Sequence, residues 1–281
     1  MSLKTVCIKT KSSILKVSVF GAHILSWKCK GEERLFLSRK AVFDGKKAIR
    51  GGIPLVFPQF GRPVDSLPSH GFARISVWDV QSLKETDTKS QLVLTLKPSS
   101  ILKDFRDAFD FNFELVYEIC LTETNLSISL RAINQGTKKF TCQMLLHTYL
   151  KLDSIERTKI SGLAKLNYQD KLKEGKVYYT QPDSKFQCIT EETDRIYKGP
   201  LNRKKIEIID TMLIENDSDG GMCDVVLWNP WIEKSKRMGD LDNTEYHDFV
   251  CVEPGIVLSP VVLSRGDSAV ISQTLTPKFN L

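Results

Sequence analysis

The chain has 281 residues, of which 26% are charged and 41% hydrophobic, and its net charge of +6 comes from 40 basic and 34 acidic side chains. This composition is typical of a globular protein with a sizeable core and excludes wholesale disorder. The charges are spread along the chain without a basic tail, which argues against nucleic acid as a partner. Large β-sandwiches reach this length as one unit, so we expect a single domain over residues 1–281. The densest basic cluster, at 198–205, is interpreted as a solvated loop.

The seven cysteines form no Cys-x-x-Cys pair and lie mostly within apolar runs. This usage is typical of reduced, structural thiols in a cytosolic protein. The first residues lack the apolar segment of a signal peptide, and no apolar run approaches the roughly 18 residues of a membrane span. We therefore expect a cytoplasmic protein that has no membrane partner.

Short β-like runs separated by polar breaks fill the first part of the chain. Alternation at 15–19 places Leu15, Val17 and Val19 on one face of a strand, and a second strand is predicted at 21–27. His23 lies among apolar neighbours in that strand. It is interpreted as a hydrogen-bonded structural histidine and not as a ligand.

The segment 50–74 shows neither a helical nor a strand period, because Gly and Pro recur every few residues among large apolar side chains. Such a segment is typical of an ordered loop, in which glycine permits tight turns and proline stiffens the backbone. Arg50, His70 and Arg74 lie towards its ends. A rigid loop with cationic ends suits the capture of a small anion.

Strands are predicted next at 76–83, 91–96, 111–119 and 126–132, with a helical turn or loop at 101–109. In the strand predicted at 140–149, alternation places Phe140 and Met144 on an apolar face and His147 on the opposite, hydrogen-bonding face. If the apolar face packs against a second sheet, His147 points into a groove.

The later segments leave several alternatives open. Asp194 is either a turn or capping residue or part of a site. A short helix is predicted after Asn229-Pro230. Glu253 ends an apolar alternating run, where burial is costly, so it forms either a structural salt bridge with Lys or Arg or part of a site. With strands at 257–263 and 267–275 the total reaches fifteen or more, which predicts an all-β, large antiparallel β-sandwich.

The motifs for several kinds of chemistry are absent from the sequence. The four histidines are far apart and none has a ligand spacing with Cys, so we expect no metal site. No phosphate-binding or dinucleotide fingerprint occurs, so no nucleotide cofactor is expected. A Ser-His-acid triad lacks the Gly-x-Ser-x-Gly elbow. What remains is a His and a Glu able to move protons in both directions, together with two arginines.

Five motifs together resemble the aldose 1-epimerase (mutarotase) superfamily, and most of all its glucose-6-phosphate 1-epimerase, or hexose-6-phosphate mutarotase, branch. They are RGGIP at 50–54 followed by Phe57-Pro58, LPSHGFAR at 67–74, the strand that ends in His147, WNPW at 228–231 and VEPG at 252–255. The resemblance implies a β-supersandwich fold, in agreement with the strand count.

The resemblance also implies roles for individual residues. His147 and Glu253 match the catalytic histidine and glutamate, Arg50 and Arg74 the substrate-binding arginines, and Asp194 a sugar-binding aspartate. Ser69 stands where relatives often have a longer Gln that contacts the substrate. His70 is expected either near the pocket or in positioning the loop.

The implied function is an isomerase that interconverts the α and β anomers of glucose 6-phosphate, with no cofactor and as a monomer. Glu253 would be the base and a protonated His147 the acid, and the two arginines would grip the 6-phosphate. Two alternatives stay open at this point. One is a non-catalytic sugar-binding or regulatory protein in which Trp228 and Trp231 line the groove, and the other is an aldose 1-epimerase for unphosphorylated sugars.

Overall fold

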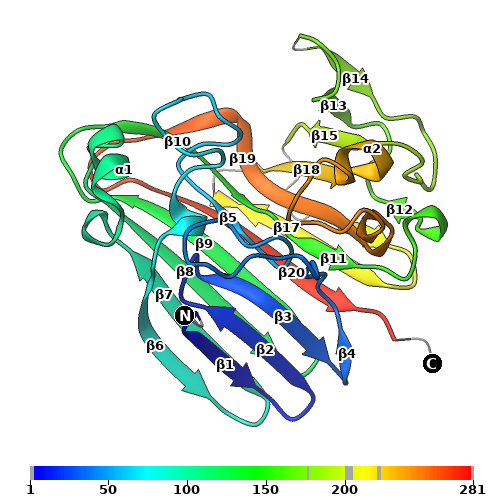
Figure 1. Cartoon of the computed structure of the whole chain (residues 1–281), viewed down its shortest axis with the longest axis horizontal. Helices are drawn as coiled ribbons and strands as arrows, with labels where there is room; N and C mark the ends of the chain where they lie inside the picture. The colour runs from blue at the N-terminus through cyan, green and yellow to red at the C-terminus, as the bar shows by residue number, and fades with distance from the viewer. Residues whose placement is uncertain (1–2, 176, 200–204, 220–222, 280–281) are drawn as a thin grey trace.

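The computed structural model describes residues 3–175, 177–199, 205–219 and 223–279, and the chain in these ranges is built largely from antiparallel β-sheet (Figure 1). Twenty strands occur there, so the prediction of fifteen or more strands in a large antiparallel β-sandwich is confirmed. The predicted solvated loop at 198–205 includes residues 200–204, which lie outside the described ranges.

Two eight-stranded sheets form the body of the molecule. The first, called here the site sheet, contains β5 (Leu55–Val56), β10 (Phe140–Leu146), β11 (Tyr149–Lys151), β13 (Asn167–Asp170), β14 (Tyr178–Thr180), β15 (Thr193–Tyr197), β18 (Asp224–Asn229) and β19 (Phe249–Leu263). The second, called the back sheet, contains β6 (Asp79–Glu85), β7 (Lys89–Leu96), β8 (Phe113–Thr122), β9 (Leu126–Asn134), β12 (Ile160–Ser161), β16 (Lys205–Ile208), β17 (Met212–Ser218) and β20 (Ser268–Pro277).

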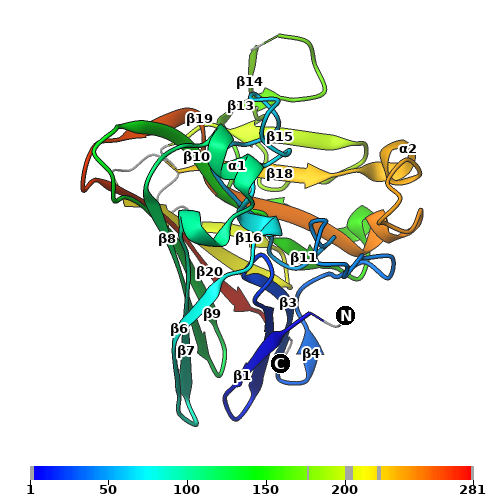
Figure 2. The ribbon, with the colours of Figure 1, turned by 60° about the vertical axis from the view of Figure 1, so that its left-hand side comes forward.

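A smaller sheet of four strands begins the chain and packs on the lower part of the back sheet (Figure 2). Its strands are β1 (Thr5–Lys9), β2 (Ser13–Ser18), β3 (His23–Cys29) and β4 (Glu32–Glu33). Its apolar side chains, including Leu15 and Trp27, join the same core as those of the large sheets.

Alternation along the strands produces the main core. In β9 every second residue from Leu126 to Asn134 is buried, and Leu126, Ile128 and Leu130 pack in the cluster that fills the space between the sheets. Each fully buried Leu or Ile contributes about 1.5–3 kcal/mol relative to an exposed one. The pairing of β9 with β8 and β20 therefore has a register fixed by burial, because a shift of one residue would turn these side chains outward.

The helices in the described ranges are short. They are α1 (Lys103–Ala108), α2 (Trp231–Ser235) and the 3-10 turns η1 (Ala73–Ile75), η2 (Pro98–Ser100), η3 (Ile155–Arg157) and η5 (Glu245–Asp248). The helical turns predicted at 101–109 and after Asn229-Pro230 are both present, and the Asn229 side-chain oxygen accepts a hydrogen bond from Trp231 N at 2.9 Å. Within the described ranges, no helix has the length and apolarity needed to cross a membrane.

The site sheet also carries a second apolar cluster on the face that points away from the back sheet. This outer cluster includes Leu145, Tyr149, Trp228, Phe249 and Cys251. It is the floor on which the candidate site is built.

Candidate active site

The loop 50–74 approaches its neighbours so closely that two positions require glycine. Gly52 has φ +61°, and a Cβ there would lie 2.0 Å from the carbonyl oxygen of Ile24. Gly71 has φ +72°, and a Cβ there would lie 2.0 Å from the carbonyl oxygen of Phe57. Because neither backbone can move without disturbing a strand or the loop itself, the loop is held rigidly, as its Gly and Pro content predicts.

His23 supports this loop from below. Its side chain is fully buried, and Nε2 lies 2.8 Å from the carbonyl oxygen of Gly51. Burial lowers the pKa of His23 to about 4, so the ring is neutral and acts as a hydrogen-bonded structural group. The interpretation drawn from its apolar neighbours is confirmed.

Arg50 is fixed at the start of the loop by two partners. Nη1 donates to the hydroxyl of Tyr149 at 2.9 Å, and Nε and Nη2 each lie 3.2 Å from a carboxylate oxygen of Asp240. Burial alone would lower the pKa of Arg50, but Tyr149 and Asp240 more than offset it and raise the pKa above its ordinary value. The guanidinium is therefore a permanent, oriented positive charge.

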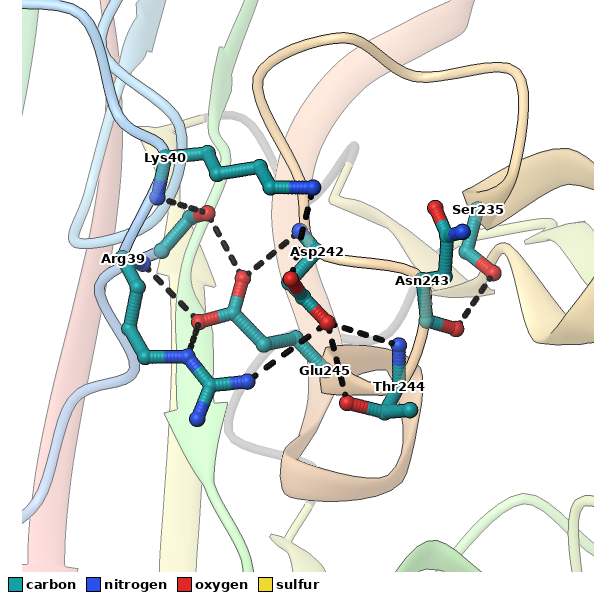
Figure 3. A network of polar contacts seen from close by, with 8 residues as sticks. Arg39, Lys40, Ser235, Asp242, Asn243, Thr244 and Glu245 are labelled. Carbon is teal, nitrogen blue, oxygen red and sulfur yellow. Dashed lines mark hydrogen bonds and ion pairs between the residues drawn. The ribbon is translucent and has the colours of Figure 1, made fainter.

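A polar network centred on Glu245 holds the loop that carries Asp240 (Figure 3). The buried carboxylate of Glu245 accepts hydrogen bonds from Ser38 Oγ at 2.7 Å, Arg39 N at 2.8 Å and Asp242 N at 2.9 Å. It thus ties residues 38–39, which precede Arg50, to the segment that follows α2. The orientation of Arg50 depends on both segments.

Arg74 lies at the other end of the loop. Its Nη2 donates to the carbonyl oxygen of Ser69 at 2.7 Å. Burial and the nearby Arg50 lower the pKa of Arg74 to about 10, which still leaves it charged at neutral pH. Two guanidinium groups are thus close enough to repel each other, an arrangement that an anion would stabilise.

His147 lies in a break between β10 and β11. The strand predicted at 140–149 is interrupted there: β10 ends at Leu146, β11 begins at Tyr149, and His147 N donates to the carbonyl oxygen of Pro54 at 3.0 Å. The predicted direction of the side chain is nonetheless confirmed, because His147 lies on the outer face beside Tyr149, with the two rings stacked 4.8 Å apart.

Glu253 reaches His147 from β19. Its Oε1 lies 3.1 Å from His147 Nδ1, but the angle is not that of a hydrogen bond, and His147 Nδ1 has no hydrogen-bond partner among the described residues. In those ranges Glu253 forms no ion pair with Lys or Arg, so the alternative of a structural salt bridge is wrong.

The electrostatics of the pair favour its neutral form. Burial lowers the pKa of His147 well below its ordinary value, and His70, Arg74 and Arg50 lower it further. Burial also raises the pKa of Glu253 well above its ordinary value, with a contribution from Asp194. Both shifts favour a neutral imidazole on His147 and a protonated carboxyl group on Glu253.

A buried glutamine of the back sheet connects the strands that carry the pair. Gln273 on β20 accepts a hydrogen bond from Thr148 Oγ1 at 2.6 Å and donates to the carbonyl oxygen of Val252 at 3.0 Å. Thr148 follows His147 and Val252 precedes Glu253. One side chain thus connects the segments that carry His147 and Glu253.

All seven residues singled out in the sequence line one cavity of about 340 Å³ above the outer cluster. The lining consists of Arg50, Phe60, Ser69, His70, Arg74, His147, Asp194, Val226, Trp228, Lys234, Met238 and Glu253. Trp228 is part of the wall, as expected. Trp231 is not, because its ring packs on Tyr246.

His70 combines the two roles that the sequence left open. It lines the cavity, and it also holds the loop, since its Nδ1 accepts from Gly61 N at 3.3 Å and its backbone N donates to the Gly61 carbonyl at 2.7 Å. Burial together with Arg74 and Arg50 lowers the pKa of His70 to about 3, so the ring is neutral. Its Nε2 then carries the proton and is a hydrogen-bond donor.

Asp194 belongs to β15 and not to a turn, so its interpretation as a turn or capping residue is wrong. Burial raises its pKa, against the opposing charges of Lys234 and Lys171. Lys234, on α2, is a cation of the wall that the sequence did not single out, and its Nζ lies 3.0 Å from Glu192 Oε1. Because α2 is only five residues long, its sequence shows no periodic pattern that would single out Lys234.

A larger cavity of about 540 Å³ lies elsewhere, between β4, β11 and the end of the chain, and is lined by Arg34, Lys151 and Asp210 among others. Arg34 Nη2 already lies 2.6 Å from Glu32 Oε2. The lining contains acidic and basic side chains but, among the described residues, no histidine. The smaller cavity, which holds the His147-Glu253 pair, is therefore the candidate site.

Comparisons with known proteins place these residues in a family. The family model described as aldose 1-epimerase matches residues 4–276. A protein from Cenchrus ciliaris named "Putative glucose-6-phosphate 1-epimerase" is 32% identical over 94% of this chain and 81% of its own length. A protein of the same name from Salmonella typhimurium is 31% identical over 91% of this chain and 84% of its own length.

Solved structures agree with the sequence comparisons. The crystal structure of a "putative mutarotase" from Salmonella typhimurium superposes with a TM-score of 0.87 at 28% identity, over 99% of this chain and 92% of that one. A galactose mutarotase related enzyme from Lactobacillus acidophilus shares the fold, with a TM-score of 0.76 at 15% identity over 98% of both chains.

Proposed function

The chain belongs to the aldose 1-epimerase family, and on this premise we propose that it is a hexose-6-phosphate mutarotase that interconverts the α and β anomers of glucose 6-phosphate. The observation that carries the proposal is the convergence of His147 and Glu253, 3.1 Å apart, with Arg50 and Arg74 in the wall of one cavity. An acid-base pair suits ring opening, and the two arginines suit a phosphate.

The reaction requires two proton transfers. In ring opening the carboxylate of Glu253 removes the proton from the anomeric hydroxyl, the imidazolium of His147 protonates the ring oxygen, and the bond between C1 and the ring oxygen breaks. The C1 carbonyl then rotates, and closure reverses both transfers on its other face. The pair ends each cycle with the single proton it started with, so no net proton is consumed.

The two arginines link substrate binding to the position of that proton. Before the sugar phosphate binds, burial and the charges of Arg74 and Arg50 disfavour an imidazolium at His147, and burial favours the protonated form of Glu253. A phosphate held by both guanidinium groups offsets their charge and raises the pKa of His147. The phosphorylated substrate thereby favours the form in which His147 is the acid and Glu253 the base.

The arginines differ in how much of their hydrogen-bonding capacity is free for a phosphate. Arg50 is engaged by Asp240 and Tyr149, whereas among the described residues the Arg74 side chain donates one hydrogen bond, to the Ser69 carbonyl oxygen. Arg74 is therefore the better placed for a two-bond contact with phosphate oxygens. Asp194, which lines the same cavity, would accept hydrogen bonds from sugar hydroxyls.

Exchange spectroscopy by NMR tests the proposal. We expect the protein to accelerate anomer exchange of glucose 6-phosphate and to act far less on glucose. Equal acceleration of both sugars would indicate an aldose 1-epimerase for unphosphorylated substrates. Binding of glucose 6-phosphate without acceleration would indicate a non-catalytic sugar-binding protein.

A further inference from the structure

Three side chains with metal-binding atoms lie close together at the cavity: His147 and Glu253 line it, and Cys251 belongs to the outer cluster. One ligand atom from each of His147, Cys251 and Glu253 lies within 4.8 Å of the other two, and all three residues are buried. Cys251 and Glu253 are two residues apart on β19 and so share one face, while His147 comes from the break after β10. His147 is distant in sequence from Cys251 and Glu253, so no motif indicates the cluster. The pairing of the strands brings the three residues together.

The imidazole of His147 offers the cluster a nitrogen that no hydrogen bond occupies among the described residues. His147 is 8% exposed, and its buried Nδ1 has no hydrogen-bond partner in the ranges that the structure describes, although it lies 3.1 Å from Glu253 Oε1. Buried polar atoms in folded proteins nearly always have a partner. A neutral imidazole nitrogen that lacks one, beside a thiol and a carboxylate, is an available metal ligand.

We propose that His147, Cys251 and Glu253 bind a thiophilic divalent cation, Zn²⁺ or Cd²⁺, in competition with the sugar. One nitrogen, one sulfur and one oxygen ligand suit Zn²⁺ and Cd²⁺, whereas Mg²⁺ takes only oxygen ligands and is excluded. A metal there occupies both members of the acid-base pair, so it inhibits anomer exchange. The inhibition rests on the proposed function, but the binding does not.

The geometry requires a small adjustment of the side chains. Ligand atoms around tetrahedral zinc are roughly 3.3–3.8 Å apart, so the widest separation in the cluster closes by about 1 Å on binding. The three protein ligands leave a fourth position, which faces the cavity through which His147 and Glu253 are reached. Water fills that position, as in other zinc sites with three protein ligands.

The affinity of the site for a cation depends on the charges around it and on the protons that binding releases. Binding converts the Cys251 thiol to a metal thiolate and releases its proton, and the proton of Glu253 also leaves when the carboxylate coordinates. Arg50 and Arg74 repel the cation, while Asp194 attracts it. A phosphate on the two arginines would occupy the cavity, so sugar phosphate and metal exclude each other.

Metal titrations test the site without relying on catalysis. Cys7 and Cys188 are exposed, so both are first replaced by Ser in the full chain to remove competing thiols. Co²⁺ titration, with absorbance detection, should give a sulfur-to-cobalt band. Calorimetry with Zn²⁺ should give one site, and glucose 6-phosphate should weaken its affinity.

The matched variants are Cys251→Ala and Cys142→Ala, each of which removes one buried thiol. Cys142 lies in the core between the sheets, so its loss should leave Zn²⁺ affinity within about twofold, whereas Cys251→Ala should weaken it about 10–100-fold or more. Cys251→Ser keeps the side-chain size if the alanine variant does not fold. Zn²⁺ affinity that is unchanged in the Cys251 variants, or absence of the cobalt band, would overturn the proposal even if anomer exchange is active.

Discussion

His147 Nδ1 and Glu253 Oε1 lie 3.1 Å apart without forming a hydrogen bond. The two groups belong to different strands of the site sheet, and both are almost completely buried. A pair at this distance titrates as a coupled unit, and burial favours the form in which the imidazole is neutral and the proton is on the carboxyl group. The position of that proton determines the effect of replacing either residue.

Removing either member of the pair should abolish anomer exchange. His147→Asn and Glu253→Gln each delete one proton donor or acceptor, and such groups contribute about 10²- to 10⁴-fold. We expect at least a 100-fold loss in the NMR exchange rate, with circular dichroism showing that the fold persists. Unchanged exchange in either variant contradicts the assignment of the pair.

Glu253→Gln should also stabilise the protein at neutral pH. The pKa of Glu253 is raised on folding, so its contribution to stability is fully present below about pH 4.5 and is lost as the pH rises towards the folded-state pKa. A neutral Gln avoids that loss. We expect a Tm increase of about 2 °C or more at pH 7, shrinking towards zero near pH 4.

Glu245→Gln is the matched control for stability. Glu245 is equally buried, but its carboxylate accepts hydrogen bonds from Ser38 and from the backbone of Arg39 and Asp242. Its replacement should lower Tm, because these donors lose a charged acceptor. If both variants are destabilised alike at pH 7, the raised pKa of Glu253 is wrong.

Arg74→Ala should discriminate between phosphorylated and free sugar. Loss of a charge-assisted hydrogen bond costs about 1.5–3 kcal/mol, so the KM for glucose 6-phosphate should rise about 10–150-fold, while the weak activity on glucose changes little. Arg62→Ala, in the same loop but exposed and paired with Asp65, should leave both sugars unaffected. An equal loss for both sugars in Arg74→Ala refutes the phosphate role.

The pH profile should extend to unusually low pH. On the acid side, activity falls when His147 becomes protonated while Glu253 also keeps its proton. Burial lowers the pKa of His147 well below its ordinary value of 6.5. Exchange on glucose, which has no titrating phosphate, should therefore be undiminished at pH 6. A fall centred at or above pH 6.5 would show that His147 keeps its ordinary pKa.

Binding of a phosphorylated sugar should move the proton towards His147. With 1,5-anhydroglucitol 6-phosphate, which cannot open its ring, the pKa of His147 measured by NMR of labelled histidine should rise relative to the free protein. The unphosphorylated 1,5-anhydroglucitol is the control and should give a smaller rise. Equal shifts with both compounds would mean that the arginines do not act on His147 through the phosphate.

Alternation and loop composition predicted part of the candidate site, whereas Glu253 and Asp194 were assigned to it only through the family resemblance. These sequence patterns placed His147 on the outer face, identified the rigid loop that carries Arg50 and Arg74, and predicted the sandwich. They did not reveal the break between β10 and β11, because the residues on both sides keep the same alternation. The pairing of Asp240 with Arg50 was also missed, since Asp240 lies in a loop that has no period and reaches Arg50 only in the folded chain.

Cys251 shows a second limit of the sequence. Its neighbours predict a buried structural thiol, and it is one, but its nearness to His147 follows from the pairing of Cys251 with Tyr149 across two strands. Such a register is set by packing along the whole of β19. No short sequence motif indicates this register.

Gln273, which accepts a hydrogen bond from Thr148 and donates one to Val252, ties the acid-base pair to the interior of the sandwich. The arginines, by contrast, are carried by the outer loop and by its contacts with the segment after α2. Such a loop can change during evolution while Gln273 keeps the spacing of His147 and Glu253 fixed. A protein built in this way can acquire a new sugar preference without rebuilding its chemistry.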